Sequence, residues 1–382
     1  MKILLAPNSF KGTLTAREVI NILKKCAYRI IPNVEIIEQP LADGGDGTLN
    51  VFMETYHGVI KKALVHNPIG KVIEVEYGII NNGKTAVIEM AKVSGIILLK
   101  NEEKNPLLTS SYGTGELIKK IIDEGINNII IGIGGSASHD GGVGLAQALG
   151  IRFFDKMGLE IGLGCSELKK ITTIDTSNVS LNIKNCQITV LYDVINPLTG
   201  ENSVSKVYGK QKGATPEMII ELEENLEHLR EVIIKQYKID PNHITGCGAA
   251  GGIGTSLFTF FKAKLVRGID YIISMTNLEN KIESCDLVIT GEGKLDSQTS
   301  FGKALLGLAK LCKLKQKPTI VIAGSIEHNA DKLFAYGITD MYSCICKPMT
   351  IDEALNNSIS LLEEAANRVF RAIAIKSGEK YV

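Results

Sequence analysis

The chain has 382 residues, of which 45% are hydrophobic, and this is enough to build two ordinary domains with separate cores. Lysine plus arginine and aspartate plus glutamate are equal in number, at 42 each, so the formal net charge is zero. This balance argues against the basic surface that binding to nucleic acid or an anionic membrane requires, and it favours chemistry on a small molecule.

The N-terminal sequence enters an apolar strand directly and shows no secretory signal pattern, and no apolar run has the length of a membrane span. We therefore expect a cytoplasmic protein. The eight cysteines are scattered and show no CxxC pairs with zinc spacing, which favours buried thiols over a metal site or disulfides.

The first part of the chain alternates strands and helices. The expected elements are a strand at 2–6, a helix from the cap Thr13 or Thr15 to Ile30, and a strand at 34–38. The following loop carries Asp43 and Asp46 among three glycines, directly before a helical stretch at 49–56. Two acids with flanking glycines favour a cation or hydroxyl site over simple helix capping.

The pattern changes from residue 67 onward. Alternation at Val72–Tyr77, an Asn-Gly turn and a second strand at Thr85–Met90 predict an antiparallel hairpin. The elements expected after it are a helix at 116–123, strands at 128–133 and 187–193, and a charged amphipathic surface helix at 216–235 with no indicated chemistry.

Strand–helix alternation returns after residue 284. A strand at 286–290 leads to a loop at 291–299, followed by a helix, a strand at 319–323 and a long final helix. We therefore predict an α/β protein in which residues 1–66 and 282–382 form a Rossmann-like parallel-sheet domain. A second, mixed α/β domain, 67–281, is inserted in it, and the acid-bearing loops are expected to face one cleft.

A glycine-rich loop at 132–144 lies between a predicted strand and a predicted helix. Such a loop can present backbone N–H groups to phosphate, and its acid, Asp140, then suggests a metal-bound nucleotide. A tight turn whose acid caps the helix is the alternative. A second glycine run, 246–254, predicts either close helix packing or a further phosphate contact.

The spacing of known catalytic motifs narrows the classes of enzyme that this chain can belong to. The Walker A, protein-kinase, HExxH and Gly-x-Ser-x-Gly patterns are absent. Gly132-Ile-Gly134-x-x-Ala137 fits a dinucleotide fingerprint with Asp155 as the ribose-binding acid, so an NAD(P)-dependent oxidoreductase acting on a small 2-hydroxy acid is an alternative. Asp140 would repel a pyrophosphate bound without metal, and Asp155 reads more simply as the start of a turn. A non-catalytic sugar-acid or nucleotide sensor is a third hypothesis.

Several ordered motifs together resemble the bacterial glycerate kinases of type 1. They are residues 6–14, 42–48, 132–137 with 140–142, Asp193 with 196–198, 211–215, 248–252 and 290–299. The resemblance implies ATP-dependent phosphorylation of D-glycerate with Mg²⁺ on two α/β domains, one inserted in the other, with 2-phosphoglycerate as the usual product. The sequence leaves both a homodimer and a monomer open. This chain has His139, Asp46 and Lys210 where the family pattern commonly has Asn, Glu and Pro.

Phosphoryl transfer needs amides and lysine for phosphate, acids for Mg²⁺ and a carboxylate near the attacking hydroxyl. We assign catalytic roles to Asp193, Asp43 and Lys11, the lysine facing the anionic substrate or the transferring phosphate. The predicted metal ligands are Asp46, Asp140 and Asp296. The predicted substrate and nucleotide contacts are Ser9, Gly134, Gly135, Ser136, Asn196, Lys212, Glu292, Lys294, Gln298 and Thr299.

Overall fold

The structure is a computed structural model, and it describes residues 1–295, 304–328 and 330–376. The chain divides into two compact units. Unit 1 comprises Met1–Ala42 and Ile269–Val382, and unit 2 comprises Asp43–Gly268. Unit 1 contains a parallel sheet and unit 2 a mixed sheet, both with helices, so the predicted fold class is confirmed.

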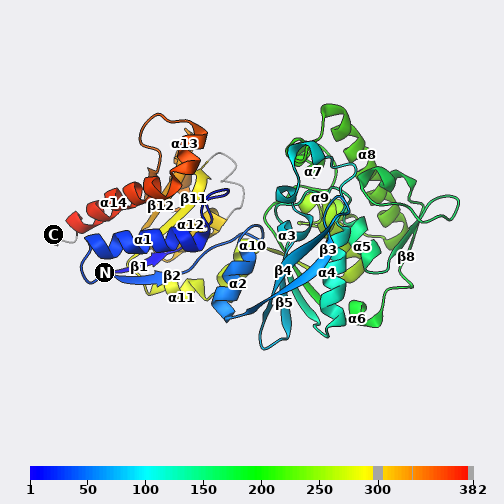
Figure 1. The fold of residues 1–382 in the computed structure, drawn as a ribbon, viewed down its shortest axis with the longest axis horizontal. Helices are drawn as coiled ribbons and strands as arrows, with labels where there is room; N and C mark the ends of the chain where they lie inside the picture. The colour runs from blue at the N-terminus through cyan, green and yellow to red at the C-terminus, as the bar shows by residue number, and fades with distance from the viewer. Residues whose placement is uncertain (296–303, 329, 377–382) are drawn as a thin grey trace. The chain divides into compact units, whose positions relative to one another are not determined.

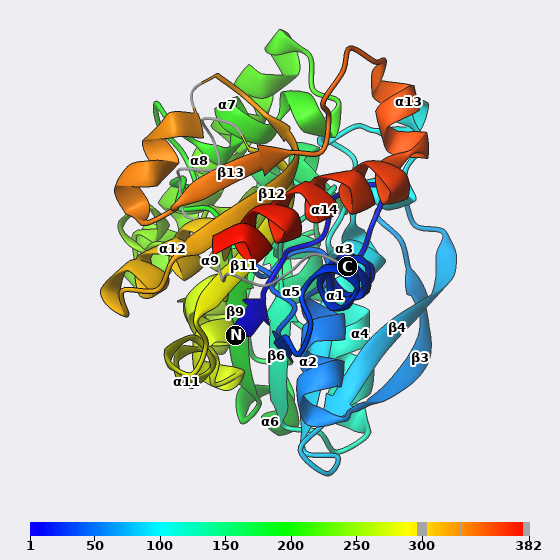
Figure 2. The same cartoon turned by 90° about the vertical axis from the view of Figure 1, so that its left-hand side faces the viewer.

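Unit 1 is built on a parallel sheet of five strands in the order β13-β12-β11-β1-β2. In Figure 2, β13, β12 and β11 lie side by side. Its core strands are short apolar runs, as expected for strands covered on both faces. The strands are β1 (Lys2–Leu5), β2 (Glu35–Glu38), β11 (Leu287–Leu295), β12 (Thr319–Ile326) and β13 (Asp340–Ser343).

Helices cover both faces of this sheet. One apolar cluster joins the sheet to α1 (Ala16–Ile30) and α14 (Ser358–Lys376), which lie along each other in Figure 1. A second cluster joins the sheet to α10 (Gly268–Met275), α11 (Leu278–Glu283) and α12 (Ala304–Leu314). Among the described residues of this unit, the other elements are the 3-10 helix η7 (Ala330–Tyr336) and α13 (Ile351–Asn356).

The first helix shows how local sequence sets these elements. Thr15 caps α1 and forms a capping box with Glu18, which satisfies open N–H groups of the first turn. Val19, Ile20 and Leu23 recur at helical spacing and are fully buried against the sheet. Of the two predicted caps, Thr15 is therefore the one that starts the helix.

Unit 2 is built on a six-stranded sheet in the order β10-β9-β6-β5-β4-β3. β4 runs antiparallel to both of its neighbours and the other pairs are parallel, so the predicted hairpin is confirmed. The strands are β3 (Val59–His66), β4 (Val72–Ile80), β5 (Thr85–Glu89), β6 (Asn128–Gly132), β9 (Gln187–Tyr192) and β10 (Lys264–Arg267).

Eight α-helices of unit 2 are described, and most of them pack into one large apolar cluster with the sheet. A separate antiparallel pair joins β7 (Arg152–Phe154) and β8 (Thr173–Asp175). The helices are α2 (Thr48–Tyr56), α3 (Ala91–Ser94), α4 (Tyr112–Asp123), α5 (Val143–Ala148), α6 (Leu181–Lys184), α7 (Val204–Tyr208), α8 (Pro216–Tyr237) and α9 (Ala249–Phe261).

The units change at residues 42/43 and 268/269, whereas the sequence predicts boundaries at 66/67 and 281/282. The difference has two physical causes. β3 pairs with β4 over Val59–His66, which ties the preceding segment to the sheet of unit 2. Ile269, Leu278 and Ile282 pack into a core cluster of unit 1, which ties α10 and α11 to that sheet.

All eight cysteines are free thiols, seven of them buried and Cys346 exposed, as the scattered spacing predicted. Within the described residues, no helix combines the length and apolarity needed to cross a bilayer.

Candidate active site

The parallel strands of unit 2 end at one edge of its sheet. β5 ends at Glu89, β6 at Gly132, β9 at Tyr192 and β10 at Arg267, and consecutive members of this set are paired in parallel. Ligands of α/β sheets gather at the carboxyl ends of parallel strands. This edge brings the predicted glycine loop and the segment that begins with Asp193 to the same side of the unit.

The loop Asp43–Gly47 packs directly on the glycine loop. The Gly134 N–H donates to the Gly44 carbonyl at 3.0 Å, and a Cβ on Gly132 would lie 2.6 Å from that oxygen. A Cβ on Gly134 would lie 2.7 Å from the Gly45 Cα. Because a side chain at either position would clash with backbone, these glycines serve the close approach of the two loops.

The two acids of this loop differ in exposure. Asp43 is buried, and its Oδ1 accepts a hydrogen bond from the Gly45 N–H at 3.3 Å. Asp46 is exposed. The structure therefore places both acids beside the glycine loop, with only Asp46 open to solvent.

Lys212 reaches the glycine loop from the 3-10 helix η4 (Lys210–Lys212). Its Nζ donates to Ser136 Oγ at 2.9 Å and to the Ser138 carbonyl at 2.6 Å. Burial lowers the pKa of Lys212 to about 7, although the nearby Asp140 carboxylate opposes the shift. Lys212 is thus in direct contact with Ser136, the serine predicted to bind nucleotide phosphate.

The carboxylate of Asp140 is buried and occupied by donors of its own unit. It accepts hydrogen bonds from the Ser111 N–H at 2.8 Å and Ser111 Oγ at 2.9 Å, and further bonds from Ser110 Oγ, Gly142 N and Gly144 N. This arrangement fixes the shape of the loop where α5 begins. Four of these five hydrogen bonds go to Oδ2, so this oxygen has no lone pair left for a metal ion unless a donor leaves.

His139 is also buried, and its Nε2 shares a hydrogen bond of 2.9 Å with Ser205 Oγ on α7. Burial, reinforced by the charge of Lys212, lowers the pKa of His139 well below its usual value. The sequence left open whether His139 contacts a ligand or shapes the loop, and its burial as a neutral ring favours the second role.

The second glycine run, 246–254, packs against the glycine loop at 132–144. Gly251 and Gly252 at the start of α9 have φ values of 72° and 90°, which favour glycine. The Gly141 N–H donates to the Gly251 carbonyl at 3.0 Å, and a Cβ on Gly252 would lie 2.9 Å from the Gly141 Cα. Of the two predicted uses of this run, close packing is the one that the contacts support.

The segment after β9 is held by the charged face of α8. Glu223 accepts hydrogen bonds from the Gly200 N–H at 2.5 Å and from Ser203 Oγ at 2.6 Å, and Glu227 accepts from Thr199 Oγ1 at 2.5 Å. The same segment is closed by Asn196, whose Nδ2 donates to the Asn202 carbonyl at 2.9 Å. The predicted surface helix therefore positions a loop that carries predicted site residues.

The remaining predicted residues belong to unit 1. Ser9 is buried and Lys11 is exposed in the loop after β1, and the Asn8 N–H donates to the Gly291 carbonyl at 2.9 Å. This hydrogen bond brings the loop beside β11, the strand that carries Glu292 and Lys294.

One element of unit 1 differs from the prediction. The expected loop at 291–299 begins as strand, because β11 continues to Leu295 and stays paired with β12, for example Glu292 with Ala323 and Lys294 with Ser325. Glu292 is buried in this strand, and Lys294 forms an ion pair of 2.6 Å with Glu327. Asp296, Gln298 and Thr299 lie outside the described residues.

Glu89 also lies at this edge of the sheet, and no sequence motif identifies it as a site residue. It is only 2% exposed at the end of β5, and its Oε2 accepts a hydrogen bond from the Leu49 N–H at 3.2 Å. Burial raises the pKa of Glu89 to about 7, and the charge of Asp46 adds to the rise. The available signal was an acid that closes an otherwise apolar strand, 85–89.

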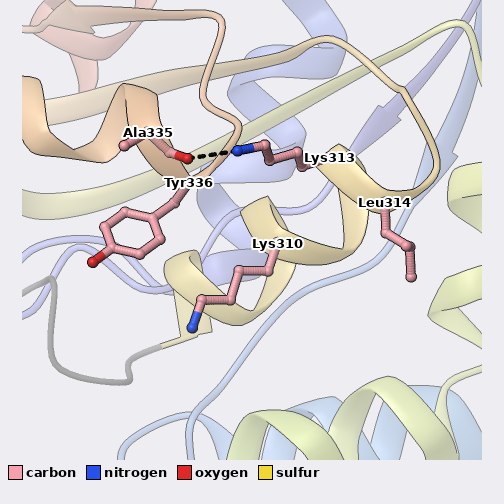
Figure 3. A pocket seen from close by; sticks show the side chains of 5 residues that line it. All are labelled: Lys310, Lys313, Leu314, Ala335 and Tyr336. Atoms are coloured by element: carbon pink, nitrogen blue, oxygen red, sulfur yellow. Dashed lines mark hydrogen bonds between the residues drawn. The ribbon is translucent and has the colours of Figure 1, made fainter.

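The described residues contain no group of three or more His, Cys, Asp or Glu side chains arranged to hold a metal. A shallow depression on unit 1 lies between α12 and η7 and is lined by Lys310, Lys313, Leu314, Ala335 and Tyr336 (Figure 3). It includes none of the predicted site residues. Lys313 Nζ donates to the Ala335 carbonyl at 2.8 Å, and Lys310 Nζ lies 5.5 Å from the centre of the Tyr336 ring.

The dinucleotide alternative fails on topology. The strand after the glycine loop, β7, pairs with β8 in a separate antiparallel sheet, whereas a dinucleotide fold needs it in the main parallel sheet. Asp155 starts a turn, because its carboxylate accepts from the Met157 and Leu159 N–H groups at 2.8 and 2.9 Å. The simpler interpretation of Asp155 is confirmed.

Comparison with known proteins agrees with the motif set. The model of the glycerate kinase family matches residues 3–374. Glycerate 2-kinase of Escherichia coli K12 is 42% identical over 98% of both chains, and glycerate kinase of Bacillus subtilis 168 is 39% identical over 98% of both.

A solved structure gives the same result for the fold. A crystal structure from Salmonella typhimurium LT2, of a protein assigned provisionally as glycerate kinase 2, is 39% identical to this chain. It covers 100% of both chains with a TM-score of 0.82. The chain therefore belongs to the glycerate kinase family and is a kinase that phosphorylates glycerate.

Proposed function

We propose that this protein transfers the γ-phosphoryl group of ATP to the 2-hydroxyl of D-glycerate with Mg²⁺, and that it belongs to the type 1 branch of its family. The observation that carries this proposal is the contact of the Asp43–Gly47 loop and Lys212 with one glycine loop. The E. coli relative, a glycerate 2-kinase at 42% identity, supports the choice of the 2-hydroxyl.

The glycine loop is our proposed site for the nucleotide phosphates. Gly135 has a φ of 75°, and within the described residues no acceptor is paired with the backbone N–H of Gly135 or Ser136. Successive N–H groups in such a turn can donate to phosphate oxygens. Lys212 lies against Ser136 and would add positive charge when protonated.

The acids of the Asp43–Gly47 loop fit a magnesium ion by their chemistry, since Mg²⁺ prefers carboxylate oxygens and substrate phosphates as ligands. We propose Asp46 as the leading ligand because it is exposed beside the glycine loop, with Asp43 as its neighbour. Bound magnesium would neutralise charge on the phosphates. The carboxylate of Asp140 is already hydrogen bonded to Ser111 and is the weaker candidate.

The remaining residues are assigned to glycerate and its activation. We propose that Asp193 accepts the proton of the attacking hydroxyl, because the residue directly follows β9 at the carboxyl edge of the sheet. Asn196 would orient the substrate from the same segment. In unit 1, Lys11 and Ser9 would bind the carboxylate or the transferring phosphate, with Glu292 and Lys294 on the adjoining strand.

An ADP-release assay with ATP, MgCl₂ and D-glycerate tests the proposal. We expect turnover that disappears when EDTA removes the metal or when glycerate is omitted. Asp193→Asn should lower kcat by about 100-fold or more, the usual contribution of a general base, while the protein stays folded by circular dichroism. No ADP release by folded wild-type protein would refute the proposed reaction, and near-normal turnover by Asp193→Asn would refute its assigned role.

A further inference from the structure

The carboxylate of Glu89 lies where β5 and β6 end together. Glu89 is paired with Gly132 in the sheet register, and the next residue, Met90, donates its N–H to the Gly132 carbonyl at 2.9 Å. Thr48, the first residue of α2, lies over the same glycine, because a Cβ on Gly132 would be 3.4 Å from Thr48 Oγ1. Glu89 is therefore fixed beside both the glycine loop and the start of α2.

Helix α2 has no capping side chain of its own. Its N-cap residue is Gly47, with a φ of 85°, and the first turn contains no acid. Open N–H groups at a helix start need an acceptor and favour a negative charge. The carboxylate of Glu89 fills this need from another element, since its Oε2 accepts from the Leu49 N–H at 3.2 Å.

We propose that Glu89 is a positioning residue that holds the Asp43–Gly47 loop in the conformation needed for phosphoryl transfer. The loop is attached at its centre by the hydrogen bond from Gly134 to Gly44, and at its end by the cap that Glu89 gives to α2. Asp43 and Asp46 lie within this short span. The expected effect of Glu89 on kcat rests on the proposed function. The hydrogen bond by which Glu89 caps α2 does not, because it is a property of the fold.

The test compares Glu89→Ala, which removes the acceptor, with Glu89→Gln, whose amide oxygen can still accept from α2. Glu89→Ala should lower kcat by about 100-fold, the effect of misplacing catalytic groups by about an ångström, while KM for ATP changes far less. Glu89→Gln should restore at least about a tenth of wild-type kcat. The matched control is Ser180→Ala, which removes the side-chain cap of α6, a helix of the same unit without predicted site residues.

Hydrogen exchange provides a readout that does not depend on activity. Amides of a peptide covering residues 45–52 should exchange several-fold faster in Glu89→Ala than in wild type, because a helix cap is lost. Glu89→Gln and Ser180→Ala should leave that peptide close to wild type. Glu89→Asp provides a further, shorter acceptor in case Glu89→Ala fails to fold, and it should show intermediate exchange and an intermediate kcat.

The outcomes distinguish failure of the positioning role of Glu89 from failure of the proposed function. Wild-type activity in Glu89→Ala, or an equal loss in Ser180→Ala, would overturn the positioning role. A loss of kcat in Glu89→Gln as large as in Glu89→Ala would also overturn it, because the hydrogen-bond acceptor would then not be the property that matters. If wild-type protein shows no turnover, the proposed function fails, and unchanged exchange at 45–52 in Glu89→Ala would separately overturn the cap.

Discussion

At the scale of single residues, hydrogen-bond partners decide which of the buried polar groups around the glycine loop can act on a ligand. Asp140 and His139 are both buried, and their side chains are hydrogen bonded to Ser111 and Ser205. We infer that these two side chains fix the conformation of the glycine loop. Lys212 differs because one of its two acceptors is the hydroxyl of Ser136, a residue of the proposed phosphate site. An incoming phosphate can therefore replace a hydroxyl as the partner of its ammonium group.

Lys212 predicts a pH dependence of stability. Its pKa in the folded protein is about 7, below the ordinary value of 10.5, so the unfolded chain binds the extra proton between these two values. The free energy of unfolding should therefore rise with pH above about 7, relative to Lys212→Met, by at most about 1.4 kcal/mol per pH unit. Urea unfolding of both proteins at several pH values between 6 and 9, values that bracket the shifted pKa, measures this difference.

The exposed Lys156 supplies the control for this experiment. Lys156→Met should show the same pH slope as wild type. If Lys212→Met also keeps the wild-type slope, the ammonium group of Lys212 is not destabilised by burial, and its proposed response to phosphate loses its basis.

At the scale of elements, the helix α8 shows how a charged face can serve a site. Its periodicity predicts an amphipathic surface helix, and its buried face does contain Leu222, Leu226 and Leu229. Part of its charged face is nevertheless committed to the segment after β9 through Glu223 and Glu227. Periodicity alone does not reveal this use, because the partners lie about one helix length earlier in the chain.

We expect Glu223→Ala to loosen this segment and lower kcat by about tenfold, since it removes two hydrogen bonds that order the loop carrying Asn196. Glu224→Ala is a close control, because Glu224 is the adjacent, exposed acid of the same helix. Steady-state kinetics with ATP and D-glycerate compares the two. Equal activity of both variants would show that α8 does not order the site.

The elements also show which parts of the fold the sequence could predict and why it could not predict others. Helix α1 was predictable because its capping box and apolar spacing are local. Strand β3 was missed because it is an edge strand with the exposed pair Lys61 and Lys62, which hides its alternation. The sequence predicts a loop at the end of β11 because Gly291 and Gly293 resemble turn residues, whereas pairing with β12 keeps the segment extended.

The site residues also differ in whether their sequence signal is local or depends on a distant partner. Asp43, Asp46 and the glycine loop stand in recognisable local motifs, so the sequence brought them forward. Glu89 acts through a hydrogen bond to Leu49, forty residues earlier in the chain, and nothing in its own neighbourhood reveals that partner. Interactions of this kind depend on the sheet register, which becomes visible only when β5 and β6 are paired.

At the scale of the whole molecule, the two ends of the chain form one unit and the middle forms another. The order of βα elements made this insertion predictable, and the unit boundaries follow from which sheet each short segment joins. The glycine loop, the Asp43–Gly47 loop and Lys212 all belong to the inserted unit. We therefore expect the proposed contacts to nucleotide phosphate to reside in that unit.

The most direct test of the proposed reaction is phosphorus–proton correlated NMR of the product made from ATP, Mg²⁺ and D-glycerate. We expect 2-phosphoglycerate, so the ester phosphorus should couple to the single methine proton on the carbon that bears the phosphate. Coupling to the two protons of the terminal CH₂ group would identify 3-phosphoglycerate and contradict the proposed position of transfer. The absence of any phosphate ester, with folded wild-type protein, Mg²⁺ and both substrates present, would contradict the proposed reaction itself.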